Sequence, residues 1–455
     1  MKSKIPLPSI REFFFLLLLF IYIYAPPLSF VPLGINKLIA PLTIVALLFG
    51  YKSMTQKVFL QKHLFIAICL LCISIIYAFA IDTSSIYSGD LAFTRKQSFS
   101  QLMTLVEVLP ITLFISIYGI RKLKLTLDGF LHRVVIVGVI QSFVAVIMFA
   151  IPGLRMFVFT TIQGYNPNED KIFRPDLYAF RSFGFSQDML FSLSTVQGIM
   201  LACVISLCLY NFAKYKYTLF FVPPLLMSIL LNARIGLSAI IVFLSVILLF
   251  SLLRLKIYLL SKLALFSLIS CLVIYLGINS ADLLFDTSLE KNIEWALGAF
   301  TEGQNFLAGS TTDTGNFGTL TSRHWHLPDT PAGRTFGEGR YLLAESINGA
   351  DVSDIGYVRK IYFGGYIYSF LVYGAFVYLF VGTQKQLPST FKPLFYAILL
   401  TTLLVHIKGD AFLPTPGYRI SSLILLFAIC ERRLKQPIAS GVKRVNNMFT
   451  SQYLS

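Results

Sequence analysis

Four short motifs place an arginine where the chain leaves or enters an apolar segment. They are Arg181-Ser-Phe-Gly184-Phe, Asn232-Ala-Arg234-Ile-Gly236, Asp354-Ile-Gly356-Tyr357-Val-Arg359, and Lys408-Gly-Asp410 with Arg419 nearby. A guanidinium is planar and always charged, and its fork of N–H donors binds phosphate or carboxylate through two hydrogen bonds. The motifs therefore indicate that an anion is handled at one face of the molecule. Pairing with nearby acidic side chains is the simpler alternative.

Other chemistry-bearing patterns are weak or absent. His324 and His326 flank Trp325 and stand two residues apart, but two such residues are poor evidence for a metal site. The sequence contains no phosphate-binding glycine loop, no dinucleotide fingerprint and no H-E-x-x-H motif. We therefore expect neither a cofactor nor a metal.

The composition identifies the kind of element that must position these residues. Of 455 residues, 56% are hydrophobic, 15% aromatic and only 13% charged, and the mean hydropathy is +0.73. A soluble domain carries about 25% charged residues, and a disordered chain has few aromatic ones. The six cysteines fall inside apolar runs without metal-ligand spacing, so we expect them to pack as small apolar residues. The chain is predicted to be an all-helical polytopic membrane protein.

Apolar runs long enough to cross a bilayer predict about twelve transmembrane helices, since a span needs about 20 apolar residues. We expect them at about 13–31, 34–50, 64–81, 99–120, 129–151, 189–211, 217–231, 235–253, 263–278, 358–381, 393–408 and 418–430. Residues 1–278 then hold nine helices with an outer loop at about 152–188. Residues 279–357 form a large, partly helical outer loop, and residues 358–455 hold three helices and a cytoplasmic tail.

Charge predicts the orientation of this bundle. Lysine and arginine concentrate in the segments on the side of both termini, which places the termini in the cytoplasm. This bias explains the net charge of +16 without a nucleic-acid partner. On the outer side arginine outnumbers lysine, although basic residues generally avoid that side. This excess of arginine favours an anion handled at the outer surface. Pairing of the arginines with outer acidic residues or with lipid phosphates is the alternative.

Glu107 stands within a predicted span, three residues before Pro110. Ionisable groups at such depth usually mark a functional site. Glu107 could face a catalytic cavity or carry protons in a transporter. A hydrogen-bonded carboxyl near Gln101 or Gln141 is the structural alternative.

The chain resembles the bacterial O-antigen polymerase and ligase superfamily in three features. These are the arginine motifs, the long outer loop that closes on Asp354–Arg359, and the Gly364-Gly365 pair after that loop. They look more like its polymerase branch, the Wzy-type proteins. The resemblance spans roughly residues 181 to 419. It implies a fold like the GT-C class and an enzyme of the bacterial inner membrane. It also implies transfer of oligosaccharide repeat units between undecaprenyl-diphosphate carriers at the periplasmic face, in contact with membrane lipid, with a chain-length regulator as a further partner.

The same resemblance implies roles for individual residues. Positive charge would stabilise the departing diphosphate, and a base would accept the proton of the acceptor hydroxyl. For the diphosphate we assign Arg181, Arg234, Arg359 and Arg419, with Arg340 and Lys408 as further candidates. For the base we assign Asp354, with Glu345 and His324 as alternatives; capping or pairing with Arg359 is the structural reading of Asp354. Tyr357 and Trp325 are candidates for stacking on sugars.

Two other functions stay open. An O-antigen ligase would use the same donor and pass the glycan to lipid A-core, and an essential His324 would favour it. A flippase or exporter of lipid-linked oligosaccharides would show twelve to fourteen helices, short loops and charges lining the bundle. The large outer loop argues against that function.

Overall fold

The computed structural model describes residues 9–31, 34–84, 97–166, 181–187, 191–233, 235–253, 324–339, 353, 355–412 and 414–435, and every regular element among them is helical. In chain order the helices are α1 (Ile10–Tyr24), α2 (Ile35–Val45), α3 (Lys52–Phe59), α4 (Lys62–Ser84), α5 (Gln97–Met103), α6 (Leu109–Lys122), α7 (Leu127–Ala150), α8 (Pro152–Phe157), α10 (Phe191–Tyr210), α11 (Phe212–Tyr215), α12 (Val222–Leu230), α13 (Ile235–Leu253), α17 (Pro331–Phe336), α18 (Gly356–Gln384), α19 (Lys392–Val405) and α20 (Pro416–Lys435). Short turns of other helix types adjoin these α-helices. The π-helical turns are η1 (Ala46–Gly50), η2 (Thr104–Val108) and η3 (Val158–Ile162), and the 3₁₀ turn is η5 (Lys216–Phe221).

Within this part of the chain, five helices are long and apolar enough to cross a membrane: α4, the continuous α5–η2–α6 helix, α7, α10 and α18. Helices α2 and α3 form a sixth candidate if they are counted together, although they are bent by 98°. The chain is thus a helical membrane protein with several candidate spans. The predicted span at 263–278 lies outside the described residues. The other eleven predicted stretches coincide with helices, but only these five or six have the makeup of a span, so the total of twelve stays a prediction.

Two predicted boundaries differ from the structure for local reasons. The first helix stops at Tyr24 rather than near residue 31, because Ala25 adopts a left-handed conformation (φ 41°) and two prolines follow it. The predicted outer loop at 152–188 begins with the helical segments α8 and η3 rather than with loop. Most of the predicted large outer loop, residues 279–357, lies outside the described residues.

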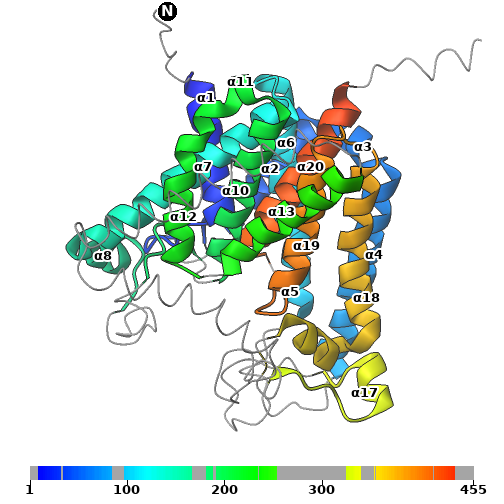
Figure 1. Cartoon of the computed structure of the whole chain (residues 1–455). Helices are drawn as coiled ribbons and strands as arrows, with labels where there is room; N and C mark the ends of the chain where they lie inside the picture. The colour runs from blue at the N-terminus through cyan, green and yellow to red at the C-terminus, as the bar shows by residue number, and fades with distance from the viewer. Residues whose placement is uncertain are drawn as a thin grey trace, which may run out of the picture.

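Helix α10 lies at the centre of one part of the bundle and packs against α7, α12 and α13. Its apolar side chains are almost all buried, so its contacts are with protein rather than with lipid. Helix α18 lies beside α4 at the other side of the molecule, with α17 packed near its first turns (Figure 1).

Helix α18 is broken at the Gly364-Gly365 pair. Gly365 has φ 66° and ψ −166°, so the backbone carbonyls of Tyr362 and Phe363 have partners outside the helix. These carbonyls accept hydrogen bonds from the backbone N–H groups of Glu338 (2.7 Å) and Gly339 (3.1 Å). A Cβ at position 365 would lie only 2.2 Å from a backbone oxygen of α17. Glycine at 365 thus allows the two backbones to approach closely.

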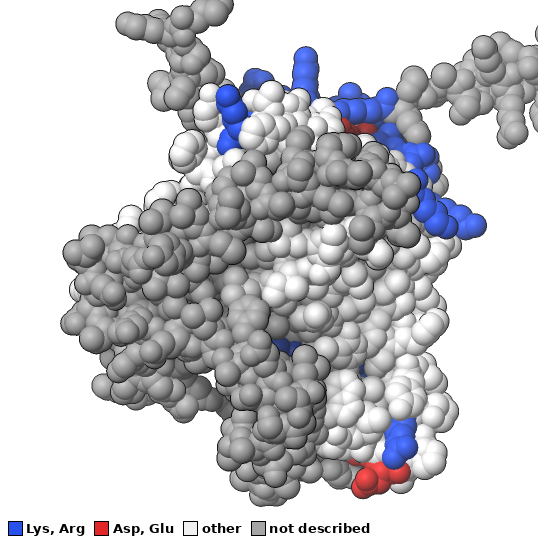
Figure 2. All heavy atoms as spheres, viewed as in Figure 1, with Lys and Arg blue, Asp and Glu red and all other residues white. Residues whose placement is uncertain are grey.

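Charged side chains are unevenly distributed along the molecule. Figure 2 shows lysine and arginine gathered toward the end where the N-terminus lies, next to a broad band without charge. Helix α20 ends in Arg432, Arg433 and Lys435 at that same end. The first residues of α20 and the last residues of α1 therefore lie toward the opposite end of the bundle.

Candidate functional site

A cavity of about 560 Å³ lies at that opposite end, where the turn after α1, the start of α2, the α5–η2 segment, the loop residues after η3 and the start of α20 meet. Among the described residues, three charged side chains line it: Lys37, Glu107 and Arg419. Its uncharged polar lining comprises Ser29, Asn36, Ser100, Gln163, Gln187 and Thr415. Segments almost 400 residues apart in the sequence thus form one polar chamber inside a largely apolar bundle.

Hydrogen bonds between loops hold the walls of this cavity in place. The backbone N–H of Gln187 donates to the carbonyl of Tyr24 at 2.9 Å, which ties the segment before α10 to the end of α1. The backbone N–H of Ser29 donates to the carbonyl of Ile162 at 2.9 Å. The Gln163 side-chain amide donates to the carbonyl of Gly184, also at 2.9 Å. Glycine is required at 184, because φ is 56° and a Cβ would lie 2.5 Å from the side chain of Gln141.

Arg419 and Glu107 form a buried but loose ion pair on the cavity wall. Arg419 Nη2 lies 3.5 Å from Glu107 Oε1 and 3.4 Å from Gln187 Oε1, and the two charged side chains are only 5% and 6% exposed. The Nε and Nη1 donors of Arg419 have no hydrogen-bond partner among the described residues. A buried donor without a partner is unfavourable, so this guanidinium has unused capacity to bind an anion.

The first turn of α2 adds a second positive element. Gly34, with φ 80°, is its N-cap and provides no side-chain cap, so the backbone N–H groups at this end remain free of a side-chain acceptor. The N-terminus of a helix favours anions. Asn36 donates to the carbonyl of Tyr22 at 3.1 Å, which fixes the turn, and Lys37 lies within electrostatic range of Glu107.

A widened helical turn presents Glu107 to the cavity. Pro110 has no N–H and crowds the preceding turn, and the backbone responds with the π-helical turn η2, in which the N–H of Leu109 bonds to the carbonyl of Thr104. Such turns are frequent at functional sites. Glu107 lines a cavity, and its partners there are Arg419 and Asn36 rather than Gln101 or Gln141; a catalytic role for this cavity stays a prediction.

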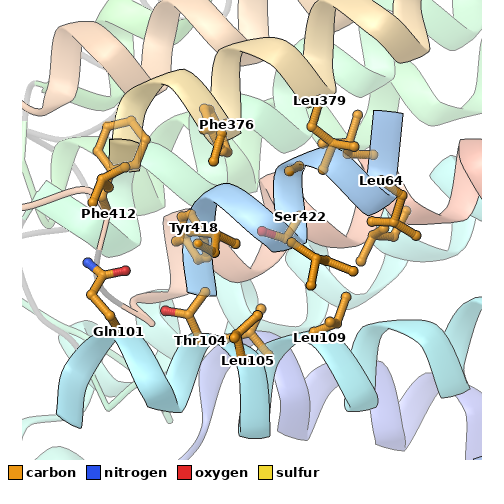
Figure 3. Close-up of a pocket in the computed structure, with 18 residues that line it drawn as sticks. Leu64, Gln101, Thr104, Leu105, Leu109, Phe376, Leu379, Phe412, Tyr418 and Ser422 are labelled. Carbon is orange, nitrogen blue, oxygen red and sulfur yellow. The ribbon is translucent and has the colours of Figure 1, made fainter. Parts of the chain in front are cut away.

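A different pocket on the other side of the same helices carries no charge (Figure 3). It encloses about 50 Å³ between α4, the α5–η2–α6 helix, α18 and α20. Its lining is apolar except for Gln101, Thr104, Tyr418 and Ser422. The charged cavity is therefore the better candidate for an anionic ligand.

The structure brings the first two arginine motifs together, but away from this cavity. Arg181 Nη1 donates to the carbonyl of Asn232 at 3.1 Å, and Arg155 Nη1 donates to the carbonyl of Arg181 at 3.0 Å. The side-chain amide of Asn232 returns a hydrogen bond to the carbonyl of Ser182 at 3.0 Å. Arg181 thus holds the turn between α12 and α13, and it is not among the residues that line the cavity.

The third motif closes the large loop onto α18. Arg359 Nε donates to the carbonyl of Ser353, and Ser353 Oγ donates to the carbonyl of His324 at 2.8 Å. Tyr357 donates its hydroxyl proton to the carbonyl of Leu403 at 2.8 Å.

The remaining predicted site residues are placed as follows. The Tyr357 ring lies edge-on to His406. Trp325 is 53% exposed, and Lys408 is exposed on the turn after α19. The other predicted site residues, Arg234, Arg340, Glu345 and Asp354, lie outside the described residues.

A second buried ion pair lies next to that turn. Lys360 Nζ lies 2.9 Å from Asp410 Oδ2, and the two side chains are 0% and 2% exposed. Lys360 also donates to Gln97 Oε1 at 3.1 Å, and Asp410 Oδ1 accepts the backbone N–H of Phe412 at 3.0 Å. His406 accepts the N–H of Ala411 through Nδ1 at 3.0 Å. This network connects α18, the start of α5 and the turn that leads into α20.

The sequence analysis missed Lys37 and the pairing of Lys360 with Asp410. The available signal for Lys37 was a glycine followed by an asparagine and a lysine at the start of a predicted span. Among the described residues, no three His, Cys, Asp or Glu side chains lie close enough together to hold a metal ion. Comparison of the chain with protein-family models, curated proteins and solved structures finds no match.

Proposed function

We propose that this chain is an integral-membrane glycosyltransferase that joins polyprenyl-diphosphate-linked oligosaccharide repeat units, as an O-antigen polymerase does. The observation that carries the proposal is the buried guanidinium of Arg419, which has two donors without partners among the described residues and lies with Lys37 on a cavity of about 560 Å³. A diphosphate is an anion that matches both the fork of an arginine and the start of a helix.

The proposed orientation places this cavity on the outer, periplasmic side of a bacterial inner membrane. The cavity lies at the end of the bundle opposite the basic end of α20, and basic residues mark the cytoplasmic side of membrane proteins. Both termini would then be cytoplasmic. An architecture of about twelve spans, similar to the GT-C class, belongs to the same proposal.

The proposed chemistry requires mainly charge stabilisation. A sugar attached to a lipid diphosphate already carries a leaving group, and the transition state develops negative charge on the departing diphosphate oxygen. Arg419 and Lys37 would stabilise that charge inside a cavity where electrostatic interactions are stronger than in water. The lipid tail would stay in the bilayer, because the cavity opens among membrane-embedded helices.

The test uses the purified protein in lipid nanodiscs with a synthetic undecaprenyl-diphosphate repeat unit, in EDTA and without nucleotide. We expect a ladder of lengthened products, and we expect Arg419→Ala to reduce turnover by about 10²–10³-fold. Arg133→Ala is the matched control, because Arg133 also forms an ion pair with a glutamate, Glu12, at 2.6 Å but lies outside the cavity. A wild-type protein that neither binds the donor nor makes the ladder would contradict the proposal.

One observation favours a flippase or exporter as the second candidate. Charged residues inside a membrane bundle often mark a transport path, and Lys360 and Asp410 are buried among the helices. Movement of the lipid-linked sugar between leaflets of a vesicle, without any lengthened product, would support this function. Glycan transfer that requires added lipid A-core would instead identify a ligase.

A further inference from the structure

The carboxylate of Glu107 has an unusual setting for a residue in a membrane-embedded helix. It lies in the widened turn η2, it lines the charged cavity, and its contact with Arg419 is a single long approach of 3.5 Å. A purely structural ion pair in such a place needs short contacts and partners for its remaining donors. Here the partner arginine retains two donors without partners.

We propose that Glu107 is the general base of the glycosyl transfer, an inference that rests on the proposed function. The carboxylate accepts the proton of the acceptor hydroxyl as that oxygen forms a bond to the anomeric carbon of the donor sugar. The bond between this carbon and the diphosphate oxygen breaks, and the lipid diphosphate leaves with the electron pair. The products are the lengthened glycan, the lipid diphosphate and a protonated Glu107, which then returns its proton to solvent.

The arrangement of charges explains why the carboxylate would be available when substrate is bound. Glu107 partly balances the charges of Arg419 and Lys37. A bound diphosphate offers Arg419 stronger, bidentate contacts than the single 3.5 Å approach, so the carboxylate is released to accept a hydrogen bond from the acceptor hydroxyl. The residue that accepts the proton, Glu107, and the residue that binds the leaving diphosphate, Arg419, thus line the same cavity.

Within the part of the chain that the structure describes, three ionisable groups face Glu107 from neighbouring elements: Arg419 from α20, Lys37 from α2 and Tyr22 from α1. The first two are cations, and the hydroxyl of Tyr22 is hydrogen-bonded to Thr112 at 2.6 Å. Arginine, lysine and tyrosine side chains ordinarily titrate well above neutral pH, whereas carboxylates ordinarily titrate in mildly acidic solution. A fall of turnover at acidic pH would therefore report protonation of Glu107 itself.

The test compares Glu107→Gln and Glu107→Asp with the wild type and with Glu12→Gln, which removes the matched glutamate of the Arg133 pair. Binding of a fluorescent undecaprenyl-diphosphate disaccharide and formation of the product ladder are measured separately. We expect Glu107→Gln to bind this donor as well as the wild type does, to lose transfer by roughly 10²–10⁴-fold, and to lose the fall at acidic pH. We expect Glu107→Asp to keep the fall at acidic pH with a lower turnover.

The outcomes separate the two proposals. If the wild type is active and Glu107→Gln transfers the sugar at a rate within a few-fold of it, with the same pH profile, Glu107 is not the general base. The proposed glycosyltransferase function would be unaffected by that result. If Glu107→Gln does not fold, Glu107→Asp decides: unchanged turnover and an unchanged pH profile would overturn the inference. A wild type that binds no donor and transfers nothing would overturn the proposed function itself.

Discussion

Lys360 and Asp410 form an ion pair that differs in almost every respect from the pair of Arg419 and Glu107. The first pair is short, at 2.9 Å, is sealed from solvent, and is completed by Gln97 and by the backbone N–H of Phe412. The second is long, at 3.5 Å, and its arginine keeps two donors without partners. The first lies inside a network between helices, and the second lies on the wall of a cavity.

The difference shows how a membrane protein can use the same kind of interaction for two purposes. A buried ion pair stabilises a fold only when its geometry is good and its other hydrogen bonds are made. The Lys360–Asp410 pair meets that condition and fixes the turn that precedes α20. The Arg419–Glu107 pair does not meet it, and its unused donors are available to a ligand. Four predictions test the distinction.

The largest effect is expected when the sealed pair is broken. Lys360→Met leaves Asp410 buried without its cation, and breaking such a pair costs about 3–5 kcal/mol of stability. Heating the purified protein with a thiol-reactive dye measures unfolding through the buried cysteines Cys203, Cys208 and Cys430. The double variant Lys360→Met/Asp410→Leu should recover part of the loss. If the single variant unfolded at the wild-type temperature, the pair would not hold the fold.

A smaller loss of stability is expected at the cavity. Arg419→Gln removes a guanidinium whose contacts are long and incomplete, so we expect about 1–2 kcal/mol of destabilisation, below that of Lys360→Met. The same dye assay measures it, with Arg133→Gln as the matched control. Equal destabilisation by Arg419→Gln and Lys360→Met would show that both pairs are structural.

Lys37 should affect binding more than stability. It lies on the cavity at the first turn of α2, and its ammonium group has no hydrogen bond to another described side chain that would be lost. Lys37→Gln should weaken binding of the fluorescent undecaprenyl-diphosphate disaccharide by about tenfold, which corresponds to 1.4 kcal/mol. The unfolding temperature should change little. Undiminished affinity would remove the start of α2 from the anion site.

The smallest effect is expected at the C-terminal end of α20. Lys435 and Glu431 form an (i, i+4) pair at 2.6 Å, but the lysine side chain is 45% exposed. Exposed helical pairs contribute about 0.3–0.5 kcal/mol, and salt screens them. Lys435→Ala should therefore unfold within a degree or two of the wild type and show full donor binding. A loss of stability as large as that of Arg419→Gln would mean that the distance between the charged atoms and their exposure do not predict how much each ion pair stabilises the fold.

Much of the helical architecture was predictable from local sequence. Apolar runs such as those of α4, α7 and α13 must satisfy their backbone hydrogen bonds within the segment when they lie in lipid, so composition alone indicates a helix there. The prediction at the end of α1 was less accurate, because apolarity continues past Tyr24 while the left-handed Ala25 and the prolines after it end the helix. The break in α18 at Gly365 and the close approach of α17 there are findings of the structure.

The candidate site was predictable only in its ingredients. The sequence by itself determined that the protein is helical and apolar, that arginines stand at the ends of its segments, and that a carboxylate, Glu107, is embedded in one of them. Only the tertiary structure decided that Arg419, 312 residues away, would meet that carboxylate, whereas Arg181 would hold a turn. The physical reason is that helix formation in lipid depends on each segment's own hydrogen bonds, whereas an ion pair or a cavity depends on how distant segments pack.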